Sequence, residues 1–373
     1  MNEKDSNDQI DRLSCDVLPT CHKINVGELS RSKRLEILIG FSSGDVVIHN
    51  AVTKSNQMFN RQLTIEKSAV KRVAWSPLNS QMFLVAHASG NMYLYDRKIQ
   101  EQQVINLPSD SKQQQRQTNQ NGFIQDTSYY FLQAKNQNTN PVARYHVSNS
   151  QLNDIKFSPD GHYLAVACND GYLKVIDFRT GKLIVTFKSY YGAFTCCCWS
   201  PDGKFISTGG EDDLVSIFDF KEKCIVARGV GHTSFVAAVI FDPIECNNDQ
   251  YRILSVGDDC KLILWNIDKV SNSDISPRKR CKKSNTIPSL SWNDVPTFEP
   301  VRIHRAHQEP IRDITVFDLG IVTVCNRNII KFWLRPKAIE EHAQFLEVDD
   351  HEHMDETDNT PPSTAVLQDA QSI

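Results

Sequence analysis

The stretch KFSPDGHYLAVACNDGYLKVIDF, residues 156–178, decides the fold, because the chain repeats it as CWSPDGKFISTGGEDDLVSIFDF at residues 198–220. Aligned on their Ser-Pro-Asp-Gly turns, the two copies lie 42 residues apart. In each copy an apolar strand ends at the turn, an alternating strand follows, and a second turn leads to a third strand rich in β-branched and aromatic residues. A repeat of this length and pattern predicts one four-stranded blade of a β-propeller.

Four more units carry the same pattern: residues 35–50, 74–96, 241–266 and 316–333. The pattern resembles the WD repeat, except that other residues can stand in place of its tryptophan. We therefore expect an all-β WD40 β-propeller with six recognisable blades. The second turns of the six units lie 46, 81, 42, 47 and 68 residues apart, at Gly44, Gly90, Gly171, Asp213, Cys260 and Asn328.

The two long spacings contain low-complexity insertions. The first, at residues 100–140, holds a Gln/Asn-rich tract, and the second, at 269–300, is basic and rich in serine. Neither has the apolar residues to make a core of its own, so we expect both to be loops extruded from one propeller that spans residues 19–336. Residues 337–373 form an acidic segment, for which we expect a disordered tail.

Composition argues against several classes of function. The chain has 41 Lys and Arg residues against 45 Asp and Glu residues, so it lacks the basic excess of nucleic-acid-binding proteins. No apolar run approaches the roughly 18 residues of a membrane span, and the polar segment after Met1 does not resemble a signal peptide. We expect no nucleic-acid or membrane partner, a cytoplasmic and nuclear location, and reduced thiols at the 11 cysteines.

Two clusters of residue types that can bind metals are better explained without a metal ion. Cys196, Cys197 and Cys198 are consecutive, so on a strand their side chains alternate between opposite faces and cannot converge on one ion. The sequence HEHMDE at residues 351–356 could bind a metal weakly, but it lies in the acidic tail, where disorder is the expected state. We expect no metal site and no cofactor.

The fifth unit contains a set of polar residues with a characteristic spacing. His232 precedes Trp265 by 33 residues and Asp259 precedes it by 6, the arrangement that joins His, Asp, Ser and Trp within one blade of WD-repeat proteins. With Ser255 as the fourth member, the resemblance implies a buried chain of hydrogen bonds that fixes the blade. An Asp-His-Ser set also suggests a hydrolase. No nucleophile elbow accompanies it, however, and we expect no catalytic residues.

Three segments carry a closer resemblance: FLVAHASGNMYLYD (83–96), TGGEDDLVSIF (208–218) and VARGVGHTSFVAAVIFDP (226–243). They resemble the group of WD-repeat proteins that includes WD repeat-containing protein 20 of animals, the dystrophia myotonica WD-repeat protein and fungal creC. The resemblance implies a non-catalytic scaffold that binds and activates a ubiquitin-specific protease, with or without a second WD-repeat activator. The alternative is a general WD-repeat adaptor or a substrate receptor in another complex, which would read phosphorylated peptides with several Arg or Lys side chains on one rim.

The number of blades has two possible interpretations. Members of this group carry another blade's worth of sequence before the segment that matches residues 19–27, whereas here 18 residues precede it. A propeller must pair its last sheet with its first or leave strand edges exposed. Either residues 10–18 supply the outer strand of the last blade and close a six-bladed ring, or the chain is a truncated seven-bladed propeller.

Two loops are expected side by side on one rim, SYYGAF (189–194) and GHTSFV (231–236). Turn chemistry does not require their aromatic residues, and the matching positions of the animal relatives are also aromatic, so the resemblance places partner binding here. The alternative is that these aromatic side chains pack inward. The expected partner-binding residues are Tyr190, Tyr191, Phe194 and Phe235.

The second insertion contains the basic segment SPRKRCKKSN (276–285). A basic run in an extended segment is a form that nuclear import receptors can read, and a solvated charge run is the alternative. The candidate import residues are Arg278, Lys279, Arg280, Lys282 and Lys283.

Overall fold

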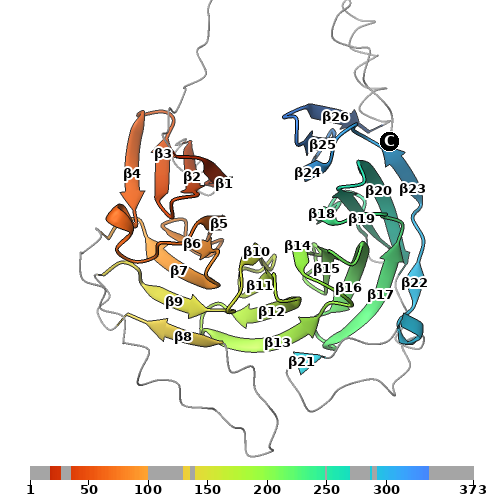
Figure 1. The fold of residues 1–373 in the computed structure, drawn as a ribbon, viewed down its shortest axis with the longest axis horizontal. Coiled ribbons are helices and arrows are strands. Elements are labelled where there is room, and N and C mark those ends of the chain that lie inside the picture. Colours follow the sequence, from red (N-terminus) through yellow and green to blue (C-terminus); the bar gives the residue numbers. More distant parts are fainter. Residues whose placement is uncertain are drawn as a thin grey trace, which may run out of the picture.

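The computed structural model describes residues 17–26, 35–99, 129–134, 139–247, 250–268, 286–287 and 292–335. Within them the strands form six sheets that follow one another around an arc, with the first strand of each sheet innermost (Figure 1). The expected six-bladed all-β propeller is confirmed. In the same ranges, two 3-10 helices lie outside the blades, η1 (Arg61–Leu63) and η4 (Trp292–Asp294). No helix in the described part of the chain is long and apolar enough to cross a membrane.

Each sheet is one blade, and its strands run from the centre of the arc outward. Blades 1 to 3 comprise β1 (Pro19–Ile24), β2 (Glu36–Phe41), β3 (Val46–Asn50) and β4 (Ser55–Phe59); β5 (Val70–Trp75), β6 (Met82–His87), β7 (Asn91–Asp96), β9 (Ala143–His146) and β8 (Tyr130–Gln133); and β10 (Leu152–Phe157), β11 (Tyr163–Cys168), β12 (Tyr172–Asp177) and β13 (Lys182–Lys188). Blades 4 to 6 comprise β14 (Phe194–Trp199), β15 (Phe205–Gly210), β16 (Leu214–Asp219) and β17 (Cys224–Val230); β18 (Val236–Phe241), β19 (Gln250–Gly257), β20 (Lys261–Asp268) and β23 (Arg302–Arg305); and β24 (Ile311–Phe317), β25 (Gly320–Cys325) and β26 (Ile330–Leu334).

The turns follow the local chemistry of the repeat. In the turn of blade 4, Ser200 Oγ donates to Asp202 Oδ1 at 2.6 Å, and the same carboxylate accepts the N–H of Lys204 at 3.1 Å. The second turns confirm the alignment of the six units, because the equivalent residue has a positive φ in every blade, a conformation that favours Gly, Asn and Asp. These φ values are 105°, 85°, 80°, 62°, 64° and 60° at Gly44, Gly90, Gly171, Asp213, Cys260 and Asn328.

The hydrophobic core lies between neighbouring blades. A middle strand of a blade is covered on both faces, which explains why β16 reads as an almost continuous apolar run and is buried at every position. Between blades 3 and 4, the rings of Phe187 and Phe218 lie 4.6 Å apart, and Val175 and Ile206 belong to the same buried cluster. This packing fixes the blades that carry the loops of interest.

Blades 1 and 6 stand at the two ends of the arc (Figure 1). Among the described strands, β26 pairs only with β25, so blade 6 has three strands where blades 1 and 5 have four. The residues expected to supply a closing strand, 10–16, lie outside the described residues, and Val17 and Leu18 are exposed.

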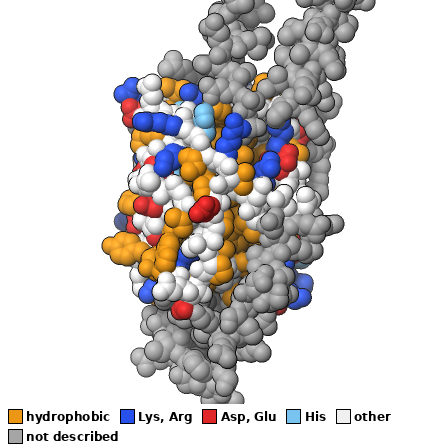
Figure 2. All heavy atoms as spheres, turned by 90° about the vertical axis from the view of Figure 1, so that its right-hand side faces the viewer, with side chains coloured by type: hydrophobic (Ala, Val, Ile, Leu, Met, Phe, Trp, Pro, Cys, Tyr) orange, Lys and Arg blue, Asp and Glu red, His pale blue; other side chains and the backbone are white. Residues whose placement is uncertain are grey.

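The expectation that both insertions are loops without core residues is wrong in part. The end of the first insertion returns as β8, which pairs with β9 and buries Leu132. In the second insertion, β21 (Thr286–Ile287) and β22 (Thr297–Phe298) add in parallel to the outer edges of β13 and β17. We call residues 292–300 the strap; its strand β22 lies beside β17 at the right of Figure 1. Figure 2 shows this side of the molecule, where hydrophobic side chains gather among charged ones.

Short apolar clusters within polar segments explain this difference. Such a cluster cannot form a core alone, but it can add to the edge of a sheet that already exists. Phe298 of the strap packs on Trp265 with ring centroids 5.3 Å apart, and Val295 is buried between blades 3 and 4. The Gln/Asn-rich tract, the basic residues 278–283 and the tail 337–373 lie outside the described residues.

Candidate functional site

Two loops on one rim carry exposed aromatic side chains. The loop 189–193 joins β13 to β14, and the loop 231–235 joins β17 to β18, so both connect the outer strand of a blade to the inner strand of the next. Tyr190, Tyr191 and Phe235 are 43%, 74% and 46% exposed. We call these three residues the aromatic rim. Large exposed rings on ordered loops are typical anchors of protein interfaces.

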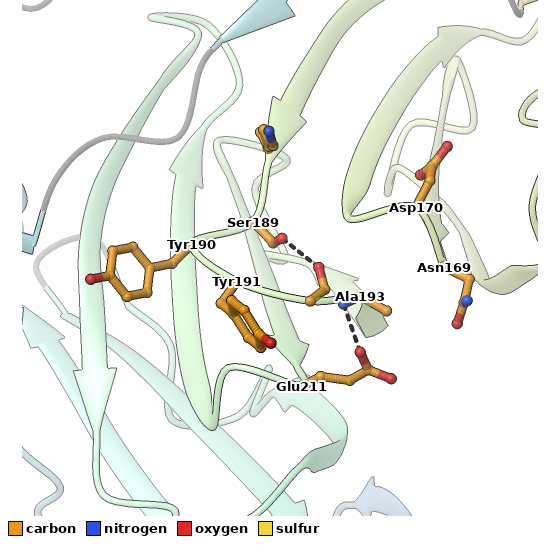
Figure 3. Close-up of a pocket in the computed structure, with 9 residues that line it drawn as sticks. Asn169, Asp170, Ser189, Tyr190, Tyr191, Ala193 and Glu211 are labelled. Carbon is orange, nitrogen blue, oxygen red and sulfur yellow. Dashed lines mark hydrogen bonds between the residues drawn. The ribbon is translucent and has the colours of Figure 1, made fainter.

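The loop 189–193 is held in one conformation (Figure 3). Ser189 Oγ donates to the carbonyl oxygen of Gly192 at 2.6 Å, and the N–H of Ala193 donates to Glu211 Oε2 at 3.0 Å. Gly192 has φ 62°, and a Cβ there would lie 2.9 Å from the side chain of Glu211. The two tyrosines leave the loop in different directions, and a pocket of about 350 Å³ opens beside Tyr191.

The turn 211–213 of blade 4 lies beneath the aromatic rim. Asp212 accepts the N–H of Leu214 at 3.2 Å, while its Oδ2 is buried without a hydrogen-bond partner among the described residues. Burial raises the pKa of the Asp212 carboxyl to about 6, although the N–H groups of Leu214 and Tyr191 and the charge of Arg228 act in the opposite direction. At neutral pH this carboxyl is mostly ionised, although burial disfavours its charged form. The carboxylate contacts the backbone of the loop that carries Tyr191.

Phe194 does not belong to the aromatic rim, and its prediction as a partner-binding residue is wrong. It is the first residue of β14 and is only 1% exposed. Its ring packs edge-on against Phe218 of the same blade, with centroids 6.0 Å apart. The strand begins one residue earlier than the sequence pattern suggested, and so its first side chain points into the core between blades.

The structure brings His232, Ser255, Asp259 and Trp265 together within blade 5. Ser255 Oγ lies 2.8 Å from His232 Nε2 and 2.8 Å from Trp265 Nε1, and His232 Nδ1 lies 3.0 Å from both carboxylate oxygens of Asp259. Because an ionised carboxylate can only accept, Nδ1 carries the proton. The chain of donors therefore runs from Trp265 through Ser255 and His232 to Asp259.

Asp259 is the charged end of this network. Burial would raise the pKa of its carboxyl, but the hydrogen bond from His232, the electrostatic attraction of that donor and the N–H groups of Thr233 and Lys261 outweigh burial and lower the pKa to about 2. The His232 side chain is fully enclosed and Asp259 nearly so. The network therefore acts as a buried brace between the loop 231–235 and the turn 258–260 of blade 5.

Two family models match the repeats of blades 3 and 4 and the residues that precede them. The model described as "WD domain, G-beta repeat" matches residues 181–219, and the model of the anaphase-promoting complex subunit 4 WD40 domain matches residues 135–197. The chain belongs to the WD-repeat family. A chain in the crystal structure of the mitotic checkpoint complex has the same fold, with a TM-score of 0.53 and 16% identity over 80% of this chain and 70% of that one.

Two curated relatives match over most of the chain. UBP9-binding protein bun62 of Schizosaccharomyces pombe is 33% identical over 354 residues, which are 85% of this chain and 64% of that protein. WD repeat-containing protein 20 of Mus musculus is 36% identical over 276 residues, which are 73% of this chain and 46% of that protein. The chain thus spans less than two thirds of the length of either relative.

A second WD-repeat network, which the sequence analysis missed, lies in blade 6. Thr323 Oγ1 lies 2.8 Å from His307 Nε2 and 2.9 Å from Trp333 Nε1, and all three residues are buried. Burial and the charge of Lys331 lower the pKa of His307. The signal was present in the sequence, because the hydroxyl residue precedes its tryptophan by 10 positions in both blades.

The consecutive cysteines are core residues of the WD-repeat blades. Cys197 lies in the cluster between blades 3 and 4, whereas Cys196 and Cys198 lie on the side of blade 5. Burial raises the pKa of the Cys196 thiol to about 12, so it is protonated at neutral pH. Within the described ranges, no three His, Cys, Asp or Glu side chains are placed to hold a metal ion.

Proposed function

We propose that this chain is a non-catalytic WD-repeat scaffold that binds a ubiquitin-specific protease through the aromatic rim and activates it, alone or with a second WD-repeat activator. The observation that carries the proposal is the exposure of Tyr191 and Phe235, at 74% and 46%, on loops that hydrogen bonds hold in place. The name of the yeast relative, UBP9-binding protein, indicates the class of partner.

Rigid loops favour docking because ordering a flexible loop opposes binding. The loop 189–193 is held by the hydrogen bond from Ser189 to Gly192 within it and by the bond from Ala193 to Glu211 outside it. In the loop 231–235, the N–H of Thr233 donates to Asp259 Oδ2 of the next turn at 3.0 Å. Both aromatic anchors are thus presented before the partner arrives. Activation then requires that the rim bind the active conformation of the protease more tightly than the inactive one.

The Asp-His-Ser set does not support a hydrolase. A nucleophilic serine must reach its substrate, whereas Ser255 is buried and its hydroxyl is engaged by both His232 and Trp265. A structural role for this set is the simpler explanation.

The alternative of a phosphopeptide receptor has less support. It would need several cationic side chains free to face a ligand on one rim. Three basic residues could be considered for this role, Lys188, Arg228 and Arg312. Arg228 is buried, and Arg312 donates to Asp258 Oδ1 at 3.0 Å. Lys188 lies over the ring of Tyr172, with Nζ 5.9 Å from its centroid.

Purified UBP9 of Schizosaccharomyces pombe is a suitable probe. We expect the chain to bind it and to increase its hydrolysis of a fluorogenic ubiquitin substrate, while the chain alone hydrolyses none. Hydrolysis by the chain alone would contradict the scaffold proposal. Binding without stimulation would support docking and refute activation.

A further inference from the structure

The strap reaches the aromatic rim through Tyr190. The side chain of Tyr190 lies between two groups from distant parts of the sequence: Arg228 of β17, whose Cζ is 4.6 Å from the ring centroid, and Trp292 of η4, whose ring centroid is 5.6 Å away at an interplanar angle of 62°. A guanidinium over one part of the ring and an edge-on indole beside it are both attractive arrangements. Tyr190 is therefore held from two sides although it is 43% exposed.

The two groups that hold Tyr190 are themselves fixed. Arg228 is 1% exposed, so its side chain is enclosed, and its backbone N–H donates to the carbonyl oxygen of Pro296 at 2.9 Å, which ties β17 to the strap. The strap continues as β22, whose Phe298 pairs with Gly229; a Cβ at Gly229 would lie 2.8 Å from the Phe298 ring. The strap therefore follows β17 closely and cannot shift without breaking this ladder.

Trp292 is anchored by the residues that follow it. Val295 donates its N–H to the carbonyl oxygen of Trp292 at 3.4 Å and is itself buried between blades 3 and 4. Trp292 remains 39% exposed, so its ring has been placed beside Tyr190 without being enclosed in the core. Its removal should leave the blades intact.

We propose that Trp292 is a positioning residue for partner docking: by holding Tyr190, it sets the conformation of the loop 189–193 and thus the direction of Tyr191. This inference rests on the proposed function. Adjacent residues share one backbone, so fixing the Tyr190 side chain restricts the φ and ψ angles that aim Tyr191. Loss of this restraint leaves the partner to order the loop on binding, which weakens affinity.

The test compares three variants with the parent protein. Trp292→Ala removes the restraint, and Trp292→Phe keeps an aromatic edge. As the control, Phe332→Ala removes an aromatic ring from β26 of blade 6 that is 59% exposed, somewhat more than Trp292. By calorimetry with UBP9, we expect Trp292→Ala to weaken binding about 3- to 10-fold, from the free energy of ordering one or two side chains. Trp292→Phe should retain most of the affinity, and Phe332→Ala should equal the parent.

A double-mutant cycle shows whether Trp292 acts through Tyr190. In a Tyr190→Ala background, Trp292→Ala should have no further effect on binding. An equal loss in both backgrounds would show that Trp292 contacts the partner directly and would overturn the inference. The inference would also be overturned if Trp292→Ala bound UBP9 with the affinity of the parent while Tyr191→Ala bound it weakly. That result would leave the proposed function standing.

Hydrogen exchange of the free protein tests the restraint without any partner. Amides of residues 190–193 should exchange faster in Trp292→Ala than in the parent or Phe332→Ala, while amides of β14 and β17 keep their rates. Unchanged exchange in the loop would refute the inference. If UBP9 binds none of these proteins, the proposed function fails, and the exchange rates still decide whether Trp292 holds the loop.

Discussion

Ser255→Ala provides a strong test of the network in blade 5. Ser255 Oγ is the shared partner of Trp265 Nε1 and His232 Nε2, each at 2.8 Å, and all three groups are buried. The substitution deletes one oxygen and leaves an indole N–H and an imidazole nitrogen without partners in the core. The matched control is Ser207→Ala, because Ser207 is equally buried on β15 of blade 4, where its Oγ has no hydrogen-bond partner among the described residues.

The expected magnitudes separate the two serines. Each buried polar group left without a partner destabilises a protein by about 1 to 3 kcal/mol, and two groups lose their partner here, so Ser255→Ala should lower the free energy of unfolding by roughly 2 to 6 kcal/mol. Ser207→Ala removes a hydroxyl that makes no hydrogen bond, so it should change this free energy by less than about 1 kcal/mol and can stabilise the protein. The contrast depends on hydrogen bonding alone, since both variants remove the same atom from a buried strand.

Guanidinium unfolding, followed together by tryptophan fluorescence and circular dichroism, measures both variants. Coincident transitions in the two signals are needed before free energies are compared. Equal losses in Ser255→Ala and Ser207→Ala would refute the reasoning, because they would show that the lost atom contacts matter and the network does not.

Three further predictions concern charge, segment exposure and location. Because burial raises the pKa of Asp212 to about 6, ionisation of this carboxyl opposes folding above that pH, and the penalty disappears as the carboxyl is protonated. Asp212→Asn should therefore be more stable than the parent by on the order of 1 to 2 kcal/mol near pH 7.5 but not near pH 4. An equal difference in stability at both pH values would contradict this prediction. Limited proteolysis should cut at residues 101–120 and 269–285 before the strap, whose residues 297–298 pair with β17, and early cuts in the strap would count against its described packing. We propose that the basic segment directs nuclear import. A fluorescent fusion should therefore move toward the cytoplasm, compared with the fusion of the parent chain, when four residues are replaced by alanine: Lys279, Arg280, Lys282 and Lys283.

The sequence predicts the parts of the fold that depend on local chemistry. The Ser-Pro-Asp-Gly turns and the positive-φ positions, such as Gly171 and Asp213, are set by residues within a few positions of each other. The spacing of His232, Asp259 and Trp265 predicts the contacts of the network for the same reason, since all lie within one repeat. The exposed positions of Tyr191 and Phe235 also agree with their places in loops between blades.

The remaining features depend on contacts between distant segments. The strap pairs with β17 across about seventy residues, and nothing near Thr297 in the sequence marks β17 as its partner. Phe194 lies one residue past a loop that exposes its other aromatic residues, and only the packing of blade 4 against blade 3 shows that it points inward. Boundaries of this kind depend on tertiary packing more than on local pattern.

The aromatic rim as the docking surface is tested most directly by calorimetry of UBP9 with the parent chain and with the Tyr191→Ala/Phe235→Ala variant. Loss of two interface anchors should weaken binding by about 2 to 4 kcal/mol, or roughly 30- to 700-fold, and abolish stimulation at the same protein concentrations. Leu78→Ala, which removes an exposed apolar side chain from a turn on the opposite rim, should bind as the parent does. A double variant that melts like the parent and still binds and stimulates UBP9 equally would contradict the account.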